Sequence, residues 1–274
     1  MAEVEWHPVH GVLMTSEPIE AYGGVAFPRG LLESFADRMN GKPLPFHLDH
    51  DLTKPIRMRG VEVFAHDRSD GITELRFRAE IHANDVRFIE SRPAMSATVM
   101  TPLARDVDTP SKSGARLQLG ADHAWFDDEA LIHAEERLVQ RGVSAEYVLV
   151  QRAYQFAVVP DPQIYIEVAV SMLLSIGASA IWDGIKALFA RRRTPPGADS
   201  SIPTTVNIQI THGNSSLRAV VTTAEAEAAH RAIEALDAVA TGFQQDAQRS
   251  TKSVEPEAST SIWDDPNRRW TPPS

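Results

Sequence analysis

Leu44-Pro-Phe-His-Leu-Asp-His-Asp51 is a short apolar run that ends in two histidines and two aspartates. Downstream, Leu75–Ile81 alternates apolar and charged residues, and Ser96 follows within Ala94-Met-Ser-Ala-Thr-Val99. A histidine at the end of one strand and a serine at the start of another can assemble a serine/histidine hydrolytic site, because the two residues meet in space and not in sequence. We therefore expect the fold to bring these segments together.

The residues around this stretch predict a compact first domain. Val61–Ala65 and Ile72–Ile81 form the clearest hairpin, and Asp67-Arg-Ser-Asp-Gly71 supplies its turn. Strict alternation in the second strand predicts one buried face and one wet face. A helix is expected from Pro28 to Gly41, whereas Thr101–Ala124 is irregular and is interpreted as a long loop.

Composition excludes several classes of function. The net charge of −10 argues against a nucleic-acid partner held through phosphate contacts. The chain has no cysteine, which excludes disulfides, thiolate chemistry and cysteine-based zinc sites. Its first residues contain no basic region followed by an apolar core, so we expect a cytoplasmic protein.

Beyond about residue 163 the pattern changes. Val168–Trp182 holds 15 residues without a charge, followed by Arg191-Arg-Arg193. A membrane span needs about 20 apolar residues. The run is therefore interpreted as a helix buried between domains or in an oligomer, and binding to a membrane surface is the less favoured alternative.

The overall prediction is an α+β chain. It has a β-barrel-like protease domain flanked by helices, then a long apolar helix and a small ββα module. The predicted boundaries are 1–163 for the domain, 164–193 for the helix, 194–203 for a linker, 204–243 for the module and 244–274 for a disordered tail.

The two histidines also suggest a metal site. His47-x-x-His50, with Asp49 and Asp51, has the residue types of a metal cluster. In an extended strand, however, residues 47 and 50 point to opposite faces and chelate poorly. We therefore expect no metal and no other cofactor, and a solvated turn is the simpler alternative.

Six features occur in a fixed order between residues 11 and 163. They are a Gly-rich turn at Tyr22–Phe27, a helix at Gly30–Asn40, His50-Asp51, a hairpin turn with Asp70-Gly71, Met95-Ser96-Ala97, and a closing Val159-Pro-Asp-Pro162. This order resembles that of the prohead (capsid-maturation) serine proteases of tailed bacteriophages, which are related to the herpesvirus assemblins.

The resemblance implies His50 as general base, Ser96 as nucleophile and backbone amides near Ala97 as oxyanion donors. The family often has glycine near the serine, where this chain has Ala94 and Met95. Gln155 stands where the family often carries a glutamate that supports the histidine. Glutamine can orient an imidazole but cannot stabilise its positive charge as a carboxylate does. Other candidates for the third member are Glu146, Asp49 and His133.

Three functions remain open, and the least favoured of them is metal-dependent hydrolysis through His47 and His50. The first is a serine endopeptidase acting on a protein or peptide substrate. The second, which Gln155 favours, is an inactive protease-like scaffold or adaptor in phage assembly or bacterial defence. Residues 165–240 resemble the effector-associated constant components of bacterial conflict systems. That resemblance implies an adaptor, and a homo-oligomer or a protein partner is expected to use residues 164–243.

Overall fold

A computed structural model describes residues 5–40, 47–48, 51–86, 95–96, 98–103, 117–155, 160–249 and 258–272. The chain divides into two compact units. The N-terminal unit comprises Met1–Val99 and Gln155–Pro160, and the C-terminal unit comprises Met100–Tyr154 and Asp161–Ser274. We predicted one domain through residue 163. Instead, residues 100–154 belong to the C-terminal unit, because their strands pair within its sheet.

The N-terminal unit is built on an antiparallel sheet of order β1-β5-β4. Its strands are β1 (Trp6–Thr15), β5 (Thr73–His82) and β4 (Met58–Asp67). The predicted β4–β5 hairpin is confirmed, with β4 longer than the pattern indicated and β5 shifted by one residue. Leu75, Phe77 and Ile81 are buried on one face of β5, as the alternation requires.

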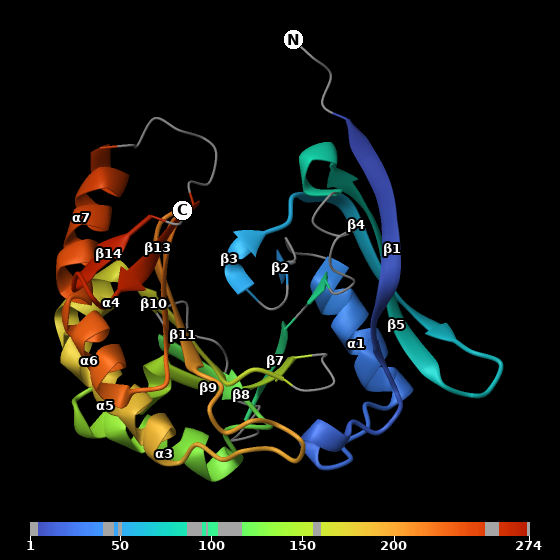
Figure 1. Cartoon of the computed structure of the whole chain (residues 1–274), viewed down its shortest axis with the longest axis horizontal. Helices are drawn as coiled ribbons and strands as arrows, with labels where there is room; N and C mark the ends of the chain where they lie inside the picture. The colour runs from blue at the N-terminus through green and yellow to red at the C-terminus, as the bar shows by residue number, and fades with distance from the viewer. Residues whose placement is uncertain are drawn as a thin grey trace. The chain divides into compact units, whose positions relative to one another are not determined.

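Helix α1 (Arg29–Asn40) covers this sheet and confirms the expected helix (Figure 1). Leu32, Phe35 and Ala36, spaced at about one turn, are buried in the core. At the helix end, Asn40 Oδ1 accepts the N–H of Val63 at 2.7 Å, and Asn40 Nδ2 donates to the carbonyl of Val63 at 2.7 Å. The amide side chain thus pairs with β4 beside its irregularity at Arg59–Glu62.

A second sheet in the same unit has the order β3-β2-β6. Its strands are short: β2 (His47–Leu48), β3 (Asp51–Pro55) and β6 (Met95–Ser96). Both pairings of β2 are antiparallel. The segments singled out in the sequence therefore do meet as neighbouring strands.

The C-terminal unit is built on a sheet whose order is β14-β13-β12-β11-β10-β8-β9-β7. Figure 1 shows α3 to α7 on one side of it. As described, the three sheets are open, so the α+β class is confirmed without a closed barrel. The bounds are β7 (Thr98–Pro102), β8 (Leu117–Asp122), α3 (Asp128–Gln140), β9 (Val148–Gln155), β11 (Thr204–His212), β12 (Ser215–Thr223), α6 (Ala226–Glu234), α7 (Leu236–Arg249), β13 (Ala258–Asp264) and β14 (Arg269–Thr271).

The apolar run is not one helix, so the prediction for 164–193 is wrong. It divides into strand β10 (Gln163–Ala169), helix α4 (Val170–Ile176) and helix α5 (Ala178–Ala190). Gly177 separates the helices at φ +77°, a conformation that favours glycine. Most of α5 is buried within its unit, against α3 and α6. Within the described residues no single helix is long and apolar enough to cross a membrane, although α4 and α5 pass that test as a pair bent by 87°.

The predicted linker and ββα module are also parts of the larger unit. Strand β11 pairs in parallel with β10 over seven residues, so the hairpin β11–β12 is integrated into the sheet. In the connection before it, Arg192 donates to the carbonyl of Ile202 at 2.5 Å and lies 4.6 Å from the ring centre of Trp125. Residues 194–203 therefore connect α5 to β11 within one folded unit.

The tail prediction is wrong where the structure describes it. Helix α7 continues to Arg249, and β13 pairs in parallel with β12. Asp265, in the turn after β13, accepts two hydrogen bonds from Arg231 of α6, at 3.1 and 2.7 Å. Sheet pairing and this ion pair hold a polar segment that composition alone assigned to disorder.

Tyr22→Phe should destabilise the N-terminal unit. The buried Tyr22 hydroxyl accepts the N–H of Gln155 at 2.7 Å and donates to its carbonyl at 3.0 Å. Phenylalanine leaves both backbone groups without this partner, which should cost roughly 2–3 kcal/mol. Urea unfolding measures the loss. Tyr147→Phe, at an exposed position, is the matched control and should change stability by less than about 0.5 kcal/mol.

Candidate functional site

The antiparallel register of β2 and β6 places His47 directly opposite Ser96, and Leu48 opposite Met95. Directly opposite residues in antiparallel strands share a face of the sheet, with Cβ atoms about 4.5–5.5 Å apart. Backbone pairing thus brings a histidine to the predicted nucleophile.

This histidine is not the one that the resemblance implied. His50 and Ala97 lie outside the described residues, so the predicted base and oxyanion donor stay predictions. His47 entered the sequence interpretation only as a metal ligand. A strand register is set by long-range pairing, and nothing within Leu44–Asp51 indicates which histidine will face Ser96.

Gln155, the predicted support for the histidine, is fully buried in the N-terminal unit, to which Ser96 and His47 also belong. It is the last residue of β9, and the Tyr22 hydroxyl holds its backbone. Tyr22, at the start of the Gly-rich turn, and Gln155 are therefore linked within the N-terminal unit.

The other candidates for the third member are Asp49, Glu146 and His133. Asp49 lies outside the described residues. Glu146 and His133 belong to the C-terminal unit, where His133 pairs with Glu136 at 3.5 Å on α3. Across the described parts of the chain, no three His, Asp or Glu side chains gather as a metal site, but the His47–His50 segment falls only partly within them.

The C-terminal unit holds a second group of ionisable side chains, at the carboxyl ends of the parallel strands β8 and β9. Asp128, at the start of α3, accepts two hydrogen bonds from Arg152 of β9, at 2.7 and 2.6 Å. His123 follows β8, and its ring lies 5.7 Å from that of Tyr154. The sequence pattern did not indicate this group, because His123 belongs to Thr101–Ala124, which was interpreted as a long loop. The structure instead has strand β8 directly before His123.

The electrostatics of this group follow from burial and from one ion pair. The hydrogen bonds of Arg152 lower the pKa of Asp128, while burial raises the pKa of Tyr154. Burial also lowers the pKa of His123, which outweighs the opposing effect of Asp128. The Nδ1 atom of His123 is buried without a hydrogen-bond partner among the described residues, and Asp128 Oδ1 lies 3.8 Å away. The imidazole is therefore held neutral.

Acid should weaken the C-terminal unit through His123. The unfolded chain takes up a proton near the ordinary pKa of 6.5, whereas the folded chain resists until a lower pH. Stability should therefore fall as the pH drops below about 6.5 and should level off below the folded pKa. Urea midpoints at pH 7.5 and 5.5 test this. In His123→Asn the fall should be smaller, while His10→Asn, at an exposed position, should behave like wild type. An equal fall in all three proteins would contradict the assignment.

Comparisons of this chain with protein-family models, curated proteins and solved structures gave no match. Its function is therefore inferred from its own residues.

Proposed function

We propose that the chain is a serine endopeptidase of the prohead-protease type, with Ser96 as nucleophile. The observation that supports this most directly is the pairing of Ser96 with His47 on β6 and β2. The order of elements adds support, because a helix, a histidine-bearing strand, a hairpin and a serine-bearing strand follow one another in the N-terminal unit. The protease-like domain then corresponds to this unit together with the end of β9.

The chemistry requires few groups. A histidine takes the proton of the Ser96 hydroxyl as its oxygen attacks the peptide carbonyl, and then returns the proton to the departing amine. Water repeats these steps to release the acyl group. Backbone N–H groups after Ser96 would stabilise the oxyanion. We assign the histidine's role to His47 on the register, with His50 as the candidate from the resemblance.

Gln155 limits the activity we expect. A glutamine can hold an imidazole by a hydrogen bond but supplies no negative charge against the imidazolium that forms in the transition state. We therefore expect a slow enzyme. Gln155→Glu should raise the rate if this side chain supports the histidine. The Gln155 position also favours the rival function, an adaptor that keeps the fold without the chemistry.

Covalent labelling tests the proposal. The purified full chain is incubated with a fluorophosphonate, which reacts with activated serines, and the labelled peptide is identified by mass spectrometry. Labelling at Ser96, absent in Ser96→Ala and after heat denaturation, is the expected result. If wild type and Ser96→Ala give identical traces, with no label at Ser96 and no cleavage of added protein substrates, the adaptor function replaces the protease.

A further inference from the structure

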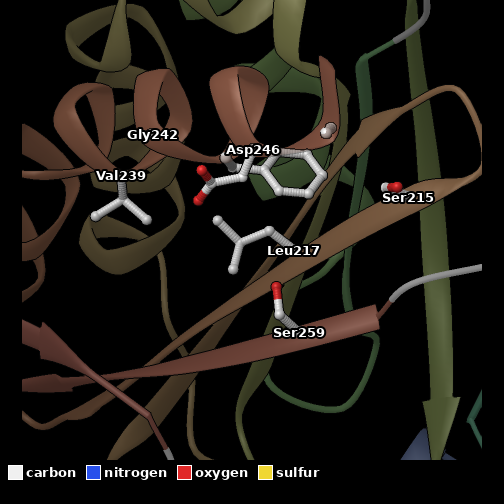
Figure 2. A pocket seen from close by; sticks show the side chains of 8 residues that line it. Ser215, Leu217, Val239, Gly242, Asp246 and Ser259 are labelled. Atoms are coloured by element: carbon white, nitrogen blue, oxygen red, sulfur yellow. The ribbon is translucent and has the colours of Figure 1, made fainter. Parts of the chain in front are cut away.

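A cavity of about 370 Å³ lies between α7 and the first residues of β12 and β13 (Figure 2). On the strand side, Leu217 pairs with Ser259, and Ser215 precedes Leu217 by two residues on the same face. On the helix side the lining residues recur at helical spacing and form one face of α7. They are Val239, Gly242, Phe243, Asp246 and Ala247.

Gly242 is the unusual member of this helix face. It lies in the interior of α7, where glycine is the least favourable residue after proline. A Cβ built on Gly242 meets no atom within 4 Å among the described residues. Gly184 in α5 is different, because its Cβ would lie 3.1 Å from Leu138 on the packed helix α3. Packing explains Gly184, whereas the missing side chain of Gly242 enlarges the cavity.

The lining has an apolar body and a polar edge. Leu217, Val239, Phe243 and Ala247 supply the apolar surface, and Ser215 and Ser259 supply hydroxyls. Asp246 is the charged lining residue, and in Figure 2 it extends from α7 on the side facing Leu217. Arg249 approaches Asp246 Oδ1 at 3.4 Å, but both side chains are 77% exposed. Such an exposed pair contributes little and can be replaced by another cation.

We propose that this cavity binds a small organic cation with an apolar body, such as an arylalkylammonium. The body would lie against Leu217 and Phe243 in the space above Gly242, with the ammonium at Asp246. The volume falls within the range of small-molecule sites, about 300–1,000 Å³. The chain's net charge of −10 favours a cation over an anion. This site lies in the C-terminal unit and does not depend on the protease chemistry.

Three probes of the same shape separate charge from apolar contact. The full chain is titrated at low salt with 2-phenylethylammonium, 2-phenylethanol and 3-phenylpropionate, followed by saturation-transfer NMR. The cation should bind saturably and a few-fold more tightly than the anion, because the Asp246 carboxylate is exposed and its attraction is screened by water. Asp246→Asn should remove the advantage of the cation over the alcohol. Gly242→Leu should weaken the binding of both the cation and the alcohol by more than about tenfold, because the leucine side chain would occupy the space that the apolar part of the ligand needs.

Gln245→Leu places the same side chain on an exposed position of α7 and is the matched control, with binding unchanged. Gly242→Leu should melt no lower than wild type, since leucine favours the helix and meets open space. The proposal fails if no probe binds saturably, or if Gly242→Leu binds all three as wild type does. It also fails if Gly242→Leu alone lowers the melting temperature by several degrees, because the chain itself would then fill the cavity.

Discussion

His47→Ala is expected to slow hydrolysis and fluorophosphonate labelling at Ser96 by roughly 10³-fold or more. The register places His47 opposite Ser96, and a serine without its general base is a poor nucleophile. The members of such a unit act together. The double variant His47→Ala/Ser96→Ala should therefore be little worse than Ser96→Ala alone. Rates of peptide cleavage and of labelling, measured on the full chain, test both statements.

His50→Ala is the decisive comparison. If His47 is the base, His50→Ala should retain labelling within about tenfold of wild type, well short of the loss of a general base. Circular dichroism and the urea midpoint of each variant establish that loss of rate is not loss of fold. The opposite outcome, an inactive His50→Ala beside an active His47→Ala, would restore the base that the resemblance implied. If both variants stay active, Ser96 has no histidine acting as its general base, and this result would contradict the proposed enzyme.

Ending the chain after residue 257 is expected to destabilise the C-terminal unit by at least about 3 kcal/mol. The deletion removes β13 and β14, including five residue pairs between β12 and β13. It also removes the two hydrogen bonds between Arg231 and Asp265 and the edge-to-face contact of Trp263 with Trp270, whose ring centres lie 5.4 Å apart. Net contributions of about 1 kcal/mol for each hydrogen bond exceed the entropy recovered by a short segment.

A disordered tail predicts the contrary result, no change in stability. Differential scanning calorimetry and urea unfolding distinguish a folded segment from a disordered one. We expect the chain that ends after residue 257 to melt about 6 °C or more below wild type. The control is a chain ending at Pro272, which keeps β13 and β14 and should melt as wild type does. The shortened chain also exposes the edge of β12, so we expect it to associate at high concentration.

Local patterns in the sequence were sufficient for several elements. Alternation over Leu75–Ile81 predicted the second strand of the hairpin, because a half-buried strand repeats every two residues. Asp127 and the apolar spacing after it are typical of a helix start, and Asp127 Oδ1 accepts the N–H of Ala130 at 2.9 Å at the beginning of α3. The alternation of apolar and polar residues and the turn signal at His212–Ser215 likewise indicate hairpin β11–β12. These signals are carried by neighbours in sequence.

The predictions that were wrong share a cause, because the structure of each segment depends on partners far along the chain. Val168–Trp182 is mostly apolar and carries no charge, and periodicity does not separate a buried strand from a buried helix in such a run. Pairing of β10 with β8 and β11 made its first part a strand. The tail is polar enough to read as disordered, yet β12 and Arg231 supply it with partners.

For the candidate site, the sequence by itself determined which residue types were present: a serine, two nearby histidines, and a glutamine where a carboxylate was expected. Only the tertiary structure decided that His47 stands opposite Ser96 and that the Tyr22 hydroxyl holds the backbone of Gln155. Residue chemistry is a local property, whereas strand register and burial arise from contacts between segments that the sequence keeps 49 and 133 positions apart.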